Sequence, residues 1–191
     1  MIFSIFGYGK FKTEASLGMV VRAISNHEKI LVIQFLKKDN TSEASFLKQQ
    51  LNVDYFTTQS ELKLTEEDKK RCDNLLIYAH ENMKEYDLIV LDESLIALDY
   101  NYMSMELFDK FIKKAKKNDK DVCLTGRIYS KSLRTKIIDI SDIASNNHCE
   151  KHAFNSFCEK CKKDYQYYFK FCPICGRKLK QPKEAKRGRD Y

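Results

Sequence analysis

The segment IFSIFGYGKFKT, residues 2–13, decides the fold predicted for this chain. Its apolar start, residues 2–6, is typical of a buried strand, and Gly7-Tyr8-Gly9 indicates a tight loop after it. Apolar residues then recur at mostly helical spacing over residues 13–25. A strand, a loop and a helix that opens with a lysine and a hydroxyl are typical of a phosphate loop, whose amides hold a polyphosphate. A glycine turn with a surface lysine is the alternative interpretation.

Apolar runs and helical patterns continue to alternate over the first 150 residues. Strands are predicted at residues 29–36, 87–93, 122–126 and 138–145, the last at a sheet edge, and helices at 65–84, 104–117 and 130–138. Continuous apolar runs suit parallel strands that are covered on both faces. Residues 39–64 are irregular and polar, which predicts a loop with one short helix. We therefore expect an α/β fold with a mostly parallel sheet and helices on both faces.

The carboxyl ends of the predicted strands carry the polar residues of interest. Ligands of parallel sheets bind outside these strand ends. Residues 7–13, Asp92-Glu93 and residues 125–127 should therefore converge on one site.

Four of the seven cysteines form two CxxC pairs near the C-terminus. The spacing C-x2-C-x10-C-x2-C lets both thiolates of a pair reach one ion, and four thiolates complete a tetrahedral shell for zinc. A closed shell leaves no position for a substrate, so the zinc should be structural and the segment a small zinc ribbon. Iron in a rubredoxin-like site and cysteines that merely pack are the alternatives. The predicted ligands are Cys158, Cys161, Cys172 and Cys175.

Length and composition favour one main domain with a small appendage. A chain of 191 residues has room for one α/β core, since single cores span roughly 100 to 200 residues. We expect an α/β domain over residues 1–147, a zinc-ribbon-like module over 148–180 and a basic disordered tail over 181–191. No apolar stretch approaches the about 20 residues of a membrane span, and the N-terminus lacks a secretory signal pattern. We therefore expect a cytoplasmic protein without membrane contact.

The net charge of +7 is concentrated at the C-terminal end. Residues 148–191 contain twelve Lys and Arg against five Asp and Glu, so this segment carries the whole excess. Aromatic residues among its lysines, at 165–171, could stack on bases, but a small core of the ribbon itself is the favoured interpretation. The main domain is neutral and offers no extended basic surface, so nucleic acid is an unlikely partner.

The loop and five later segments resemble, in order, those of the ATP:corrinoid adenosyltransferases of the P-loop type, whose loop reads GNGKGKTT. The later segments are LGMVVRA with Arg22, ILVIQFLK, YDLIVLDE with Asp92 and Glu93, LTGR at 124–127 and KHAF at 151–154. The resemblance covers residues 1 to about 157 and implies a P-loop NTPase-like fold of the RecA-like type. It also implies a homodimeric enzyme of vitamin B12 coenzyme metabolism. In such an enzyme the cobalt(I) of a corrinoid attacks the 5′ carbon of ATP and expels triphosphate.

The resemblance also assigns roles to individual residues. Lys12 and Glu93 would be catalytic, because Lys12 holds the triphosphate and Glu93, with Thr13, holds the magnesium that accompanies ATP. Phe56 resembles one of the aromatic residues with which the family displaces the lower axial ligand of cobalt, and would bind the corrinoid. The nucleotide-binding residues would be Gly7, Gly9, Lys10, Lys12, Thr13 and Arg127.

Four residues depart from the family pattern, namely Tyr8, Phe11, Glu14 and Thr58. Phe11 replaces a glycine that lets the backbone approach phosphate. Glu14 puts a carboxylate near the phosphate oxygens, which should weaken binding by on the order of 1 to 3 kcal/mol. Two alternatives stay open. One is a catalytically degenerate protein that binds nucleotide or corrinoid and uses its zinc ribbon to bind a protein partner, and the other is a nucleic-acid-binding module.

Overall fold

The computed structural model describes residues 1–9, 11–59, 65–147, 155–161, 163–166, 171–172 and 174–179. The chain divides into two compact units, Met1–His148 and Cys149–Tyr191. Several sequence predictions lie outside the described residues, namely those on Lys10, the KHAF segment at 151–154, the aromatic residues at 167–169 and the tail at 181–191.

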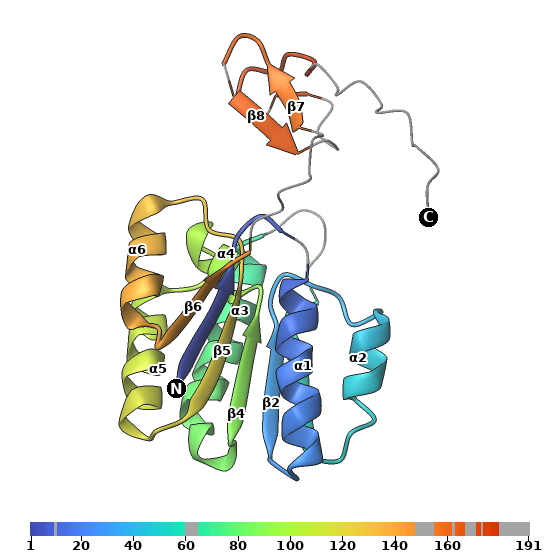
Figure 1. The fold of residues 1–191 in the computed structure, drawn as a ribbon, viewed down its shortest axis with the longest axis vertical. Helices are drawn as coiled ribbons and strands as arrows, with labels where there is room; N and C mark the ends of the chain where they lie inside the picture. Colours follow the sequence, from blue (N-terminus) through green and yellow to red (C-terminus); the bar gives the residue numbers. More distant parts are fainter. Residues whose placement is uncertain are drawn as a thin grey trace. The chain divides into compact units, whose positions relative to one another are not determined.

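Six parallel strands form the sheet of the first unit, in the order β3-β2-β4-β5-β1-β6 (Figure 1). The strands are β1 (Ile2–Phe6), β2 (Ile30–Gln34), β3 (Val53–Thr57), β4 (Leu88–Asp92), β5 (Asp121–Gly126) and β6 (Ile143–Asn146). Because β5 lies between β1 and β4, one strand separates the loop after β1 from the carboxylates at the end of β4. The predicted parallel sheet is confirmed, with the predicted edge strand at β6.

Helices cover both faces of this sheet, as predicted (Figure 1). Strand side chains alternate between two cores, because successive residues of a strand point to opposite faces. Ile30 and Val32 belong to the core under α1 and α2, whereas Leu31 and Ile33 belong to the core under the other helices. The helices are α1 (Lys12–Ser25), α2 (Ser42–Leu47), α3 (Glu66–Glu81), α4 (Ser94–Asp99), α5 (Met105–Lys117) and α6 (Lys131–Ile140).

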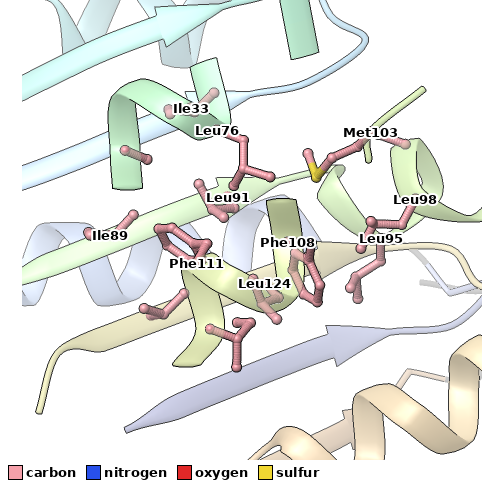
Figure 2. Packing of buried hydrophobic residues seen from close by; sticks show 14 of the residues in the cluster. Ile33, Leu76, Ile89, Leu91, Leu95, Leu98, Met103, Phe108, Phe111 and Leu124 are labelled. Carbon is pink, nitrogen blue, oxygen red and sulfur yellow. The ribbon is translucent and has the colours of Figure 1, made fainter. Parts of the chain in front are cut away.

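The larger core lies between the sheet and α3 to α6. Figure 2 shows Phe108 and Phe111 of α5 in this core together with Leu91 of β4 and Leu124 of β5. Both phenylalanine rings are fully buried. Burial of such a side chain contributes roughly 1.5 to 3 kcal/mol, so α5 is held firmly on the sheet.

Side-chain caps begin most of the longer helices, but not α1. Thr65 and Asp68 form a capping box at α3, and Ser104 accepts a hydrogen bond from the first turn of α5. Ser130 does the same at α6. Phe11 precedes α1 and supplies no side-chain cap. The first-turn amides of α1 therefore keep their capacity to bind an anion.

Residues 39–64 contain more structure than predicted. The expected short helix is α2, but Val53–Thr57 is a strand, β3, which pairs in parallel with β2. The apolar residues of β3 are few and mostly half-buried because the strand lies at a sheet edge, so the sequence shows only a short apolar island there.

Other bounds also differ from the predictions. Residues 138–140 end α6 instead of beginning the edge strand, so β6 begins at Ile143. α3 ends at Glu81 rather than near residue 84, and a short 3₁₀ helix, Met83–Glu85, follows it. α4, which the sequence analysis did not predict, begins immediately after Glu93. No helix among the described residues is both long enough and apolar enough to cross a membrane.

The second unit contains one antiparallel hairpin, β7 (Asn155–Cys158) and β8 (Lys163–Gln166). Phe171 and Lys178 form a separate antiparallel bridge around the second CxxC pair. Only Leu179 joins the cysteines in the small buried cluster of the described part of this unit.

Candidate active site and metal centre

The loop after β1 packs closely against the end of β6. Gly9 donates its amide hydrogen to the Asn147 carbonyl at 2.9 Å, and a Cβ at Gly9 would lie 2.5 Å from Asn147 Oδ1. Gly7 has a φ of 113°, which favours glycine. Both glycines are therefore required by the loop's conformation and packing.

Phe11 adopts a backbone conformation that favours glycine. Its φ is 74° and its ψ 13°, in the left-handed region that costs a non-glycine residue roughly 1 to 2 kcal/mol. The side chain is 69% exposed, so the ring is not packed into the loop. Phe11 therefore strains the backbone immediately before α1, in a conformation that glycine would adopt without cost.

Lys12 is buried and tied to the loop. Its Nζ donates to the Gly9 carbonyl oxygen at 2.6 Å. Burial lowers the pKa of Lys12, and the nearby Glu93 carboxylate offsets part of this effect. The side chain thus places a positive charge next to the loop carbonyl and within the electrostatic field of the β4 carboxylates.

Asp92 is the centre of a set of hydrogen bonds that we call the Asp92 network. Its side chain is only 1% exposed. Oδ1 accepts from Thr125 Oγ1 at 2.5 Å and from Thr13 Oγ1 at 3.1 Å. Oδ2 accepts from Gln34 Nε2 at 2.9 Å and from Lys37 Nζ at 2.7 Å. Four donors satisfy the carboxylate, so Asp92 is a buried organising residue.

Glu93 differs sharply from its neighbour. It has a φ of 57° and immediately precedes α4, while its amide donates to Thr125 Oγ1 at 3.0 Å. Burial, together with the charge of Asp92, raises the pKa of the Glu93 carboxyl. Within the described part of the chain, no side chain donates a hydrogen bond to this carboxylate. Glu93 is therefore the acid of the site with oxygens available to a cation.

The remaining predicted residues are placed differently. Arg127 follows β5 and acts electrostatically on both Lys12 and Glu93. Glu14 lies exposed in the first turn of α1. Phe56 is on β3, separated from β1 by three strands, and its ring packs edge-on against Tyr78 of α3 at 4.9 Å. The structure does not bring Phe56 together with the phosphate loop.

Sequence analysis gave no role to Gln34 and Lys37, and none to Thr125 beyond its place at a strand end. Gln34 is the last residue of β2, Lys37 lies three residues further along the chain, and Thr125 is the penultimate residue of β5. They reach Asp92 because Gln34 is its register partner on the neighbouring strand and β5 lies on the other side. The sequence feature that could have identified Gln34 and Thr125 is a polar residue near the end of an otherwise apolar strand.

The four predicted metal ligands do come together in the second unit. The sulfur atoms of Cys158, Cys161, Cys172 and Cys175 all lie within 4.8 Å of one another. Two of the separations are 3.6 Å, between Cys158 and Cys175, and 3.8 Å, between Cys161 and Cys172. Cys161 N donates to Cys158 Sγ, and Gly176 adopts a φ of 68° after the second pair. Such a quartet could hold one metal ion.

Comparison with known proteins decides the family. Residues 1–162 match the model of the family described as ATP:corrinoid adenosyltransferase BtuR/CobO/CobP. The chain belongs to this family. The match confirms the predicted resemblance and makes the protein a transferase of the corrinoid adenosyltransferase family. It ends between the two CxxC pairs, so Cys172 and Cys175 lie beyond it.

Relatives agree with this assignment. A corrinoid adenosyltransferase of Sinorhizobium sp is 28% identical over 159 residues, which cover 78% of this chain and 72% of the relative. The Escherichia coli K12 protein of the same name is 26% identical over 158 residues, or 78% of this chain and 77% of that protein. A Pseudomonas aeruginosa corrinoid adenosyltransferase is 28% identical over 158 residues, or 78% and 75%.

Among solved structures, the flagellar accessory protein FlaH of Methanocaldococcus jannaschii is similar in fold. The TM-score is 0.53 at 16% identity, and the similarity covers 76% of this chain and 69% of FlaH. At this identity the likeness concerns the fold alone, and it agrees with the predicted P-loop-like α/β class.

Proposed function

We propose that the protein transfers the 5′-deoxyadenosyl group of ATP to a reduced cobalt corrinoid and releases triphosphate, as a step of vitamin B12 coenzyme metabolism. The observation that carries the proposal is the residue before α1, because Phe11 adopts a left-handed conformation and leads into α1 without a side-chain cap, as a phosphate loop requires. Family membership supports the same chemistry.

In the proposed reaction, the cobalt(I) electron pair forms a bond to the 5′ carbon of ATP. The bond from that carbon to the α-phosphate oxygen breaks, and its electron pair leaves with triphosphate. The free amides of α1 and the buried Lys12 ammonium face the growing negative charge of the leaving group. Positive groups held in place before the reaction stabilise such charge without reorganisation.

The residues around the loop fit the magnesium ion that accompanies ATP. Thr13 and Glu93 would hold it, and when bound it would supply positive charge to the triphosphate. Glu93 fits because its carboxylate accepts no hydrogen bond from any described side chain. Asp92 would act indirectly, since its oxygens already accept four hydrogen bonds and it fixes the Thr13 hydroxyl at 3.1 Å.

For the corrinoid, we propose that the paired rings of Phe56 and Tyr78 lie beside the bound macrocycle. Thr58, which replaces a second aromatic residue of the family pattern, is buried and accepts a hydrogen bond from Leu36 N at 2.9 Å. It therefore has a structural role in the strand end. Tyr78 supplies the aromatic contact to Phe56 instead.

We further propose that the cysteine quartet holds structural zinc. Four sulfurs arranged tetrahedrally about 2.3 Å from zinc are about 3.8 Å apart. The separations of 3.6 and 3.8 Å agree with this value. The proposal includes a zinc-ribbon-like module at 148–180 and a basic tail at 181–191. We also propose that the protein is a cytoplasmic homodimer. The ribbon would bind a protein partner.

Calorimetric titration with MgATP tests the proposed function. The zinc-loaded full chain should bind MgATP in the micromolar to millimolar range. Lys12→Ala should abolish this binding. Lys38→Ala, which removes the same charge from an exposed position, should leave it unchanged. No binding at several millimolar would exclude the proposal, while binding without adenosyl transfer would favour the degenerate nucleotide-binding alternative.

A further inference from the structure

Lys37 is held in a defined place at the edge of the candidate site. Its carbonyl oxygen accepts a hydrogen bond from Thr57 Oγ1 at 2.5 Å, at the end of β3. The preceding amide, of Leu36, donates to the buried Thr58 hydroxyl, and Leu36 itself has a φ of 54°. The ends of two adjacent strands thus fix the backbone that carries the Lys37 ammonium.

The ammonium contacts two oxygens at once. Lys37 Nζ lies 2.7 Å from Asp92 Oδ2 and 3.2 Å from Thr13 Oγ1. The Thr13 hydroxyl donates its own hydrogen to Asp92, so Lys37 occupies one of its two lone pairs. The Lys37 side chain is 24% exposed, so part of it contacts solvent.

The positive charge of Lys37 affects whether a metal cation can bind near Thr13. The Lys37 ammonium forms an ion pair with the buried Asp92 carboxylate, and this places a positive charge beside the Thr13 hydroxyl. Without this lysine, the Glu93 carboxylate and the Thr13 hydroxyl would lie beside a buried Asp92 carboxylate that keeps three hydrogen-bond donors. Oxygen groups of this kind bind hard divalent cations. With Lys37 present, a cation that approached Thr13 would meet a like charge.

We propose that Lys37 is a built-in counter-cation that keeps divalent metal out of the nucleotide-free protein, so that magnesium enters together with the nucleotide. The second half of this statement rests on the proposed function. Phosphate oxygens offer the ammonium a new partner, and its departure from Thr13 frees that hydroxyl oxygen for the metal. Lys37 is thus a positioning residue that sets the order in which metal and nucleotide bind.

Manganese binding without nucleotide tests the exclusion directly. The probe is Mn²⁺ alone, added to the zinc-loaded full chain and followed by the electron paramagnetic resonance signal of the free ion. Lys37→Met should lower the dissociation constant for Mn²⁺ by about tenfold or more, because one positive charge leaves the site. Lys38→Met, a matched change at the exposed neighbouring position, should behave as the unchanged protein.

Two further variants keep the test decisive. Lys37→Gln retains a hydrogen-bond donor for Asp92 and should give the same gain if Lys37→Met does not fold. Glu93→Gln combined with either change should remove the gained binding. Equal Mn²⁺ affinity in the unchanged protein and in a folded Lys37 variant would overturn the proposal, as would a gain that survives Glu93→Gln. Failure of the protein to bind MgATP would refute the proposed function but not this exclusion, which is measured without nucleotide.

Discussion

The Asp92 network of the first unit and the cysteine quartet of the second are both clusters of ligating side chains, but different forces assemble them. The network forms from the sheet, because Gln34 and Asp92 are register partners on adjacent strands. The quartet joins a short hairpin to a second CxxC pair, and Leu179 is the one further residue in its buried cluster among those described. We therefore expect the Asp92 network to form without a ligand and the quartet to form only when it binds a metal ion.

Removal of the metal should have the largest effect on stability, and this effect should be confined to the second unit. Chelation, or Cys172→Ser, should abolish hydrogen-exchange protection in β7 and β8, because binding of the proposed structural zinc would supply roughly 10 to 16 kcal/mol of folding free energy. Protection in the sheet of the first unit should not change. Cys149→Ser, outside the quartet, is the control. Persistent protection of the hairpin without metal would show that the module folds by itself.

Removal of an aromatic ring from the larger core should destabilise the first unit and leave metal binding in the second unit unchanged. Phe111→Ala should lower the free energy of unfolding of the first unit by about 3 to 5 kcal/mol, since it leaves a cavity between α5 and the sheet. Zinc stoichiometry should stay at one. Urea unfolding and a zinc assay measure both quantities, and Phe46→Ala, at a half-exposed position of α2, provides the matched control. Loss of zinc from Phe111→Ala would contradict the independence of the two units.

Glu93→Gln should have a smaller effect, with a characteristic pH dependence. The pKa of Glu93 is raised in the folded protein, so its ionised form opposes folding above that pKa. The variant should therefore be more stable at about pH 8, by less than about 2 kcal/mol. This gain should vanish as the pH falls through the raised pKa towards the unfolded value of about 4.3. Urea unfolding at about pH 8 and pH 4 measures the difference, and a gain independent of pH would refute this explanation.

Phe11→Gly should change stability least. Relief of left-handed strain, roughly 1 to 2 kcal/mol, is about half offset by the backbone entropy of an added glycine, roughly 0.5 to 1 kcal/mol. The variant should nevertheless bind MgATP more tightly, and more so when combined with Glu14→Thr. Calorimetry measures the affinity and urea unfolding the stability. Unchanged affinity in the double variant would mean that the loop does not face a nucleotide.

How far the sequence predicts each region follows from the range of the interactions. The strands β1, β2, β4 and β5 are continuous apolar runs, and the cysteine ligands are set by local spacing, so both could be predicted. The strand β3 could not, because its identity depends on pairing with β2. The contact of Lys37 with Asp92 joins residues that are 55 positions apart, through the register of two strands. No periodicity within one segment encodes such a contact.

A single-turnover assay tests the central claim most directly. The zinc-loaded protein is mixed anaerobically with MgATP and a chemically reduced cobalt(I) corrinoid, and both the absorbance of the cobalt–carbon product and the release of triphosphate are followed. The account predicts one triphosphate for each cobalt–carbon bond formed, with both lost in Lys12→Ala. Bound ATP that yields neither product would contradict it, and would leave a protein that keeps the phosphate loop without the transfer reaction.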